Sequence, residues 1–256
     1  MSTEAMDTAP DIPTESIPDE KIIDDGDLLI NCCDKSGGKF LVSTAVIKRA
    51  SPVFKAMLGL RFREGQLKTL PLEVECPEDH WAGMRLMLQL LHNCASCVDG
   101  EMPTFAALEC FAFMAILADK YQCIEPLSLQ VDGVLSNASS LRLTDRNNFN
   151  KLYCLAVAAY VLKKPKHFYV FTKRLVLEQT KQFHNLHERF VPGIGDVLGF
   201  RFIFELETQR TAAILFVSEG VRDMAKAWCV KKGSYKTGVC IEAGHSTFHK
   251  SNECQL

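Results

Sequence analysis

The chain has 256 residues, of which 47% are apolar and 23% charged, and these proportions are typical of a globular protein with a buried core. The net charge is −2 and the pI is near 6.4, so no basic field exists to hold a nucleic acid or an anionic membrane, and we expect neither as a partner. No stretch reaches about 18 uninterrupted apolar residues, which argues against a membrane span.

The first 22 residues are predicted to form a disordered acidic arm. Residues 1–20 carry six acidic side chains and three prolines and contain no lysine or arginine. Such a segment cannot bury enough apolar surface to offset the entropy lost on ordering. We expect ordered structure to begin near Ile22 and interpret the arm as a solvated linker, with an acidic partner-binding tail as the alternative.

The first ordered elements are predicted to be a β-hairpin followed by two short helices. Residues 27–32 form a short apolar run bounded by glycines, as a buried strand does, and residues 39–42 would be its hairpin partner. Ser43 is the predicted N-cap of the first helix. Pro52 can only open a helix, so we predict a second helix after a break at Ser51.

One further strand and a series of helices are predicted for the rest of the chain. Leu70, Leu72 and Val74 alternate with polar or proline residues, and the internal Pro71 indicates an edge strand. Apolar spacing predicts helices over about residues 77–91, 104–121, 126–135, 149–162, 167–180 and 204–228, with a polar junction over 136–148 and an irregular segment over 182–199. The helix over 104–121 is apolar on nearly all sides, which is typical of a helix central to a core.

Several short motifs between about residues 24 and 136 occur in an order found in one known family. The motifs are Gly26-Asp27-Leu28-Leu29-Ile30, Phe40-Leu41-Val42-Ser43, Ala50-Ser51-Pro52-Val53-Phe54-Lys55-Ala56-Met57, Phe62-Arg63-Glu64-Gly65, Leu70-Pro71-Leu72 and Leu117-Ala118-Asp119-Lys120-Tyr121. Together they resemble the BTB/POZ domain, and in particular the single-BTB-domain proteins of filamentous fungi. Ser43 departs from the many members that carry a histidine there. Lys48 and Arg49 have no evident acidic partner, so we do not predict the charged pocket of the transcription-factor subgroup.

The resemblance implies an α+β protein in which a small sheet capped by a helical cluster, the BTB/POZ fold, is followed by an all-helical C-terminal extension. We expect the domain to span residues 23–138, between the arm at 1–22 and a helical region at 139–228. Residues 229–256 would form a polar, flexible tail.

The resemblance also implies a function without catalysis. A BTB domain is a protein-interaction module without an active site or cofactor, and we expect it to form a homo-oligomer through its sheet edge and early helices or to recruit other proteins. One such role is that of a cullin-type ubiquitin-ligase adaptor, and the alternative is a transcription or signalling scaffold without a ligase role. Motifs for phosphate binding, zinc proteases and serine hydrolases are not found in the sequence, which also predicts a protein that is not an enzyme.

Phe62, Arg63 and Glu64 are the candidate partner-binding residues. They fit the hydrophobic-x-Glu pattern with which BTB adaptors dock on a cullin scaffold, at the family's position for it. The pattern would place an apolar anchor in a pocket beside one fixed carboxylate. The alternative is that these residues only shape a loop.

The eleven cysteines are interpreted mainly as reduced, buried thiols of an intracellular protein in the cytoplasm or nucleus. Their number is odd, they are not set at regular intervals between turns, and residues 1–9 form no secretory signal. Cys94 and Cys97 could be a redox pair or half a metal site. We favour two incidental thiols, since the pair follows a helix C-terminus, whereas redox pairs usually lie at a helix N-terminus that lowers the thiol pKa.

The C-terminal tail holds four residues that could bind zinc. Cys240, His245, His249 and Cys254 have spacings that would allow four ligands around one ion. The tail lacks the close cysteine pair and the apolar residues of ordered zinc modules. We therefore expect no bound metal and interpret the four residues as chance ligands in a flexible tail, with a zinc- or thiol-dependent function as the remaining alternative.

Overall fold

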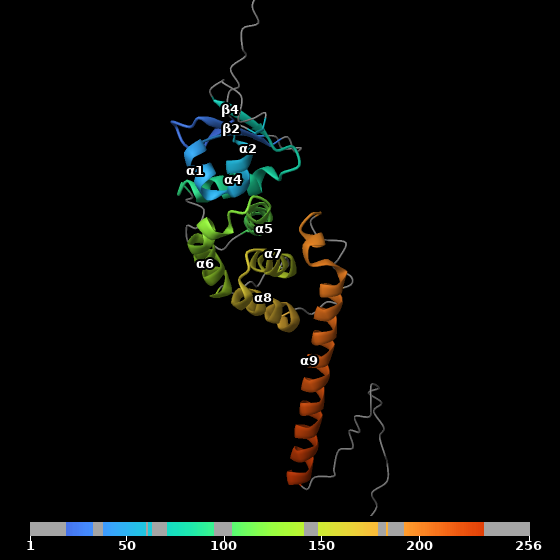
Figure 1. The fold of residues 1–256 in the computed structure, drawn as a ribbon. Coiled ribbons are helices and arrows are strands. Elements are labelled where there is room, and N and C mark those ends of the chain that lie inside the picture. Colours follow the sequence, from blue (N-terminus) through green and yellow to red (C-terminus); the bar gives the residue numbers. More distant parts are fainter. Residues whose placement is uncertain are drawn as a thin grey trace, which may run out of the picture.

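The computed structural model describes residues 19–32, 38–59, 61–62, 71–94, 104–140, 148–178, 183 and 192–232, with side chains up to residue 228. The protein is α+β, mostly helical with one small mixed sheet, and this part of the predicted fold class is confirmed. Figure 1 shows the sheet at one end, a stack of helices beneath it, and the long last helix running away from the stack.

The sheet has four strands in the order β1-β3-β2-β4. Strands β2 (Leu28–Cys32) and β3 (Gly38–Val42) form the predicted antiparallel hairpin. Strand β4 (Leu72–Glu75) pairs with β2 in parallel and lies at an edge, as the proline at position 71 indicates. Pro71 itself precedes β4, so the predicted strand starts two residues too early.

Ordered structure begins earlier than the sequence predicts. Strand β1 (Glu20–Lys21) pairs in parallel with β3, and the Asp19 N–H donates to the Lys39 carbonyl at 2.9 Å. Glu20 also forms an ion pair of 2.6 Å with Arg85. Composition alone hides this strand, because its stability comes from the open edge of β3 and from a distant arginine. The rest of the predicted arm, residues 1–18, lies outside the described residues.

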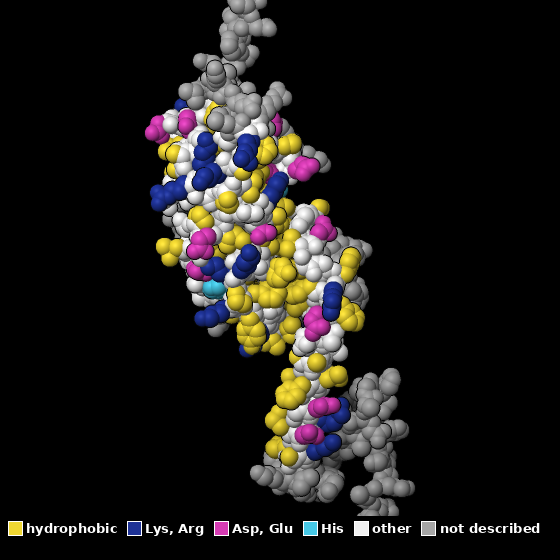
Figure 2. Space-filling view, viewed as in Figure 1, with side chains coloured by type: hydrophobic (Ala, Val, Ile, Leu, Met, Phe, Trp, Pro, Cys, Tyr) yellow, Lys and Arg dark blue, Asp and Glu magenta, His cyan; other side chains and the backbone are white. Residues whose placement is uncertain are grey.

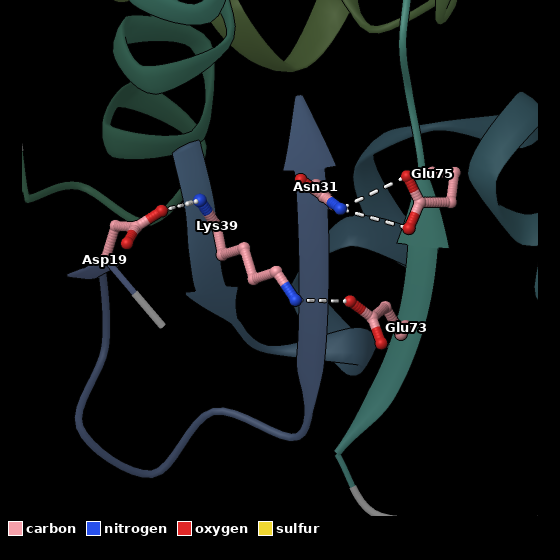
Figure 3. A network of polar contacts seen from close by, with 5 residues as sticks. All are labelled: Asp19, Asn31, Lys39, Glu73 and Glu75. Atoms are coloured by element: carbon pink, nitrogen blue, oxygen red, sulfur yellow. Dashed lines mark hydrogen bonds and ion pairs between the residues drawn. The ribbon is translucent and has the colours of Figure 1, made fainter. Parts of the chain in front are cut away.

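Polar side chains are linked across one face of the sheet (Figure 3). Lys39 on β3 reaches over β2 to Glu73 on β4, with a distance of 2.9 Å between Nζ and Oε1. The Asn31 side-chain amide contacts both carboxylate oxygens of Glu75, at 3.0 and 3.1 Å. The Lys39 N–H donates to the Asp19 carboxylate at 2.8 Å, which ties β1 into the same network. This alternation leaves the opposite face apolar.

The apolar face of the sheet packs against α1 (Thr44–Ala50), α2 (Pro52–Met57) and α4 (Trp81–Leu91) (Figure 1). The buried side chains on this face are Leu28, Ile30, Cys32, Phe40, Val42 and Val74. The predicted break between the two short helices is confirmed at Ser51. Its extended backbone ends α1, and its hydroxyl accepts a hydrogen bond of 3.0 Å from the Phe54 N–H to cap α2.

The remaining helices continue the stack away from the sheet. Helices α5 (Phe105–Lys120), α7 (Asn148–Val161) and α8 (Pro165–Glu178) lie one on the next, with α6 (Ile124–Ser140) along their side (Figure 1). As predicted, α5 is central, because it packs on both α4 and α7. Helix α7 is buried still more completely, and one hydrophobic cluster continues from Ile22 to Leu206.

Two helices are longer than predicted. Helix α6 continues through residues 136–140, which the sequence predicts to belong to a polar junction, because Ala138 extends the buried stripe of Leu127, Val131 and Leu135. Helix α9 (Gly195–Lys232) begins within residues 182–199, the segment predicted to be irregular. Gly199 interrupts α9 with a φ of 65° and a ψ of 176°, a conformation that favours glycine. Among the described residues of the segment predicted to be irregular, 192–194 form a turn, as predicted, and the backbone is helical from residue 195 except at Gly199.

Candidate functional site

The start of α1 is capped by a residue from a different element. Ser43 occupies the predicted N-cap position, but its side chain makes no capping hydrogen bond. The Asp27 carboxylate, just before β2, instead accepts from the Thr44 N–H at 2.6 Å. A carboxylate at this end of a helix satisfies a free N–H and interacts favourably with the helix dipole. The sequence therefore predicts the N-cap position correctly, but the capping side chain is that of Asp27 and not that of Ser43.

His92 also binds the N-terminal end of α1, through the Ser43 N–H. The Ser43 N–H donates to His92 Nε2 at 3.1 Å, and His92 Nδ1 lies 2.8 Å from the Leu88 carbonyl. Nε2 accepts, so the ring is neutral and carries its hydrogen on Nδ1. Burial lowers the pKa of His92, and the hydrogen bond to Leu88 opposes this effect. The end of α4 thus fixes the beginning of α1.

A buried polar cluster around Tyr121 packs against the start of α2. The Tyr121 ring stacks on Phe54 with a centroid distance of 4.2 Å, and the Ser51 hydroxyl donates to the Tyr121 carbonyl at 2.6 Å. The Tyr121 hydroxyl donates to the Asp79 carboxylate, which is only 2% exposed. Lys120 Nζ lies 2.5 Å from the other Asp79 oxygen. Hydroxyl and ammonium groups together compensate the buried carboxylate, so the cluster has a structural explanation.

With these contacts in place, α1 and α2 present a basic surface. Ile47 and Phe54 point into the core. Residues 43–62 contain four basic residues and no acidic residue, the basic ones being Lys48, Arg49, Lys55 and Arg61. None of the four forms an ion pair with another residue that the structure describes. Figure 2 shows basic side chains gathered over this end of the molecule.

Phe62 lies at the border of this basic surface. Its N–H donates to the Gly59 carbonyl at 3.2 Å in the turn that follows α2, and its side chain is 50% exposed. An aromatic side chain held in a hydrogen-bonded turn and open to water is suited to contact a partner. Arg63 and Glu64, the other two residues of the predicted docking motif, lie outside the described residues.

The cysteines that the structure describes are mostly buried. Cys32, Cys76, Cys123 and Cys154 are buried, Cys110 is partly buried and Cys94 is exposed. Burial raises the pKa of Cys76 to about 11 and that of Cys123 and Cys154 to about 12, so these thiols stay protonated at neutral pH. Cys94 follows the end of α4 as predicted, and Cys97 lies outside the described residues.

The four zinc-ligand candidates of the tail lie outside the described residues. Cys240, His245, His249 and Cys254 all lie beyond residue 232, where the described part of the chain ends. Within the described part, no group of three or more histidine, cysteine or acidic side chains has the arrangement of a metal site. The tail residues therefore stay a sequence prediction.

Comparison with known proteins adds no assignment. No protein-family model and no curated protein matches the sequence. Among the helices that the structure describes, none is long and apolar enough to cross a membrane. The candidate surface is the one made by α1, α2 and Phe62.

Proposed function

We propose that this protein is a non-enzymatic interaction module of the BTB/POZ type that recruits a partner protein through α1, α2 and Phe62. The order of elements supports the proposal: a hairpin, a helix pair, a strand parallel to the first, and two packed helices. The motif residues also have structural roles that account for their presence. Asp27 caps α1, Ser51 caps α2, and Tyr121 anchors both Phe54 and Asp79.

The exposed side chain of Phe62 is the observation that carries the proposal. Large aromatic residues are common anchors of interfaces, where burial of one ring can dominate the binding energy. The basic surface beside it favours an acidic partner, and two copies of that surface would repel each other. A cullin-type scaffold would receive Phe62 in an apolar pocket, with Glu64 supplying the carboxylate of the docking motif. The protein would then act as a ubiquitin-ligase adaptor.

The test is capture of a purified cullin by the double variant Phe62→Ala with Glu64→Ala. We expect at least about tenfold weaker binding, because truncation of an anchor residue typically costs 2 kcal/mol or more in an interface. Leu129→Ala is the matched control, since Leu129 is an apolar side chain on α6 that is 83% exposed and far from α2 in sequence. Its binding should equal that of the unmodified chain.

Circular dichroism and thermal unfolding should show that both variants keep the fold. If the folded double variant captures the cullin as well as the unmodified chain does, the adaptor role is wrong. The transcription or signalling scaffold would then be the better hypothesis, because the basic surface of α1 and α2 requires no cullin. Self-association through the edge strands β1 or β4 belongs to both roles and would be unchanged in the double variant.

A further inference from the structure

The point where the N-terminal arm joins the folded protein is held by acidic side chains. The Asp19 carboxylate accepts from the Lys39 N–H at 2.8 Å, and Glu20 forms an ion pair of 2.6 Å with Arg85. Figure 3 shows Asp19 beside Lys39, at the edge of the sheet from which the preceding residues continue. The acidic residues at this end of the chain therefore make contacts with the rest of the protein.

The eighteen residues before Asp19 carry more charge of the same sign. They contain four acidic residues and no lysine or arginine, so that their side-chain charge is −4. The acidic residues are Glu4, Asp7, Asp11 and Glu15, one in every three or four positions. Composition alone favours a solvated linker, because the segment has few apolar side chains to bury. The outcome then depends on whether opposite charge lies within its reach.

The basic surface of α1 and α2 supplies charge of the opposite sign. Arg49, Lys55 and Arg61 are exposed, and Lys48 is partly exposed. Within the described part of the chain, none of the four forms an ion pair. Lys48 and Arg49 lie in the last turn of α1, whereas the Asp27 carboxylate caps its first turn. The surface therefore has a charge of +4 that a flexible acidic segment can neutralise.

The arm is long enough to reach this surface. Lys39, the neighbour of Asp19 on β3, precedes Thr44 at the start of α1 by five residues, which span at most about 17 Å. A flexible segment of eighteen residues has a root-mean-square end-to-end distance of roughly 21–25 Å. Helix α8 also carries exposed lysines, but Figure 1 shows it at the other end of the helical stack. The point of attachment therefore favours α1 and α2.

We propose that residues 1–18 bind the basic surface of α1 and α2 through their carboxylates, so that an acidic partner must displace the arm. A weak contact is sufficient, because a short flexible tether supplies an effective concentration of about 1 mM. An arm whose dissociation constant as a separate peptide is about 0.1 mM would then occupy the surface about 90% of the time. The displacement by a partner rests on the function proposed above, whereas the contact between arm and surface does not.

The test is the binding of a fluorescein-labelled peptide with the sequence of residues 1–18, measured by anisotropy. One protein is the unmodified full chain, and the other is a full-length neutral-arm variant with Glu4→Gln, Asp7→Asn, Asp11→Asn and Glu15→Gln. The peptide should bind the neutral-arm variant about tenfold more tightly, because the unmodified arm competes with it. A rise in NaCl from about 0.1 to 1 M should weaken this binding strongly, since it shortens the Debye length from about 10 to 3 Å.

Two further variants, made in the neutral-arm chain, locate the contact. Arg49→Glu with Lys55→Glu reverses two exposed charges on α1 and α2, and we expect peptide binding to weaken at least about tenfold. Lys166→Glu with Lys173→Glu is the matched control, because it reverses two exposed charges on α8. The control should bind the peptide as the neutral-arm variant does. Circular dichroism should show that all variants keep the fold.

Cross-linking of the unmodified chain provides a second measurement. A carbodiimide joins a carboxylate directly to an amine, without a spacer, so it reports only groups in contact. Mass spectrometry of the digested monomer should find arm carboxylates linked to Lys48 or Lys55. The same links should be absent from the neutral-arm variant, which has no carboxylate at the four positions.

Three results would overturn the proposal. Equal binding of the peptide to the unmodified and neutral-arm chains would mean that the arm leaves the surface open. Peptide binding that survives the Arg49→Glu, Lys55→Glu change would place the contact elsewhere. An unmodified chain without links to Lys48 or Lys55 would show that the arm does not lie there. None of these assays contains a cullin, so their failure leaves the adaptor role standing, and failure of the cullin test leaves the arm contact standing.

Discussion

His92 is the residue whose chemistry is most sensitive to its surroundings at the candidate surface. The histidine is half-buried and can hold the Ser43 N–H only while its Nε2 carries no proton. Protonation would convert this acceptor into a donor facing another donor and would leave the Ser43 N–H without its acceptor. Burial therefore favours the neutral ring in the folded protein, and the hydrogen bond to the Leu88 carbonyl only partly opposes it.

The free energy of unfolding should consequently fall as the pH is lowered. Folding lowers the pKa of His92, so near pH 6.5 the unfolded chain binds a proton at this residue while the folded chain does not. The free energy of unfolding therefore decreases below that pH. His92→Gln removes this titration. Urea unfolding between pH 7.5 and 5 should therefore show a smaller loss of stability for the variant than for the unmodified chain. Equal losses in both would mean that His92 is not the group responsible.

The residues that the sequence reveals at this scale are those whose partners are close in the chain. Ser51 and Pro52 predict the helix break, because a cap and an N-terminal proline act within three residues. Asp27 and His92 act on α1 from positions 17 and 49 residues away from their partners. A pattern in the sequence cannot pair such residues, since the pairing depends on how β2 and α4 pack.

At the scale of elements, α4 and α5 come very close to each other at Gly83. A Cβ atom at this position would lie 2.7 Å from the Cβ of Phe113, and 2.9 Å and 3.0 Å from backbone atoms of α5. Backbone atoms cannot rotate away, so any larger residue must push the two helices apart. Phe113 in turn stacks on His80, whose Nδ1 accepts from the Gly83 N–H and caps α4. Gly83 thus sets the spacing of this helix pair, and His80 caps α4 beside it.

Gly83→Ala should destabilise the protein, although alanine usually favours a helix. We expect the overpacking cost of about 1–3 kcal/mol to outweigh the gain in helix propensity of about 1 kcal/mol. Gly133→Ala on α6 is the matched control, because a Cβ there has no atom within 4 Å and only the propensity gain applies. Thermal unfolding should place the midpoint of Gly83→Ala below, and that of Gly133→Ala above, the midpoint of the unmodified chain. A stabilised Gly83→Ala would contradict the close contact.

Most elements are predictable because each carries its own periodic pattern. The hairpin, the helix pair, the edge strand and α5 follow from apolar spacing, glycine and proline. The errors occur where a neighbour supplies the stability. Strand β1 depends on the edge of β3, and the last turn of α6 depends on the burial of Ala138. Similarly, the spacing of Ile214, Val217 and Val221 predicts a helix with an apolar side but cannot tell whether the described chain covers it.

At the scale of the whole molecule, the helical region after α6 completes the core begun by the sheet. Helix α5 packs on α4 with one side and on α7 with another, and both contacts are among the most extensive in the protein. Ten of the fourteen residues of α7 are buried. The predicted domain boundary at residue 138 lies where the motifs and the composition change. Such a change does not indicate which helices share a core.

The chain cut after Ser140 should therefore not fold stably on its own. The cut removes α7, α8 and α9 and exposes apolar side chains of α5 to water, which costs roughly 25 cal/mol for each Å². We expect aggregation, or a monomer that binds a hydrophobic dye and unfolds without a sharp transition. The control is a cut after Arg210, which keeps the buried Ile203 and Leu206 and should unfold cooperatively near the midpoint of the full chain. Calorimetry of both fragments decides the matter, because a sharp transition of residues 1–140 at the same midpoint would show that the first half is an independent domain.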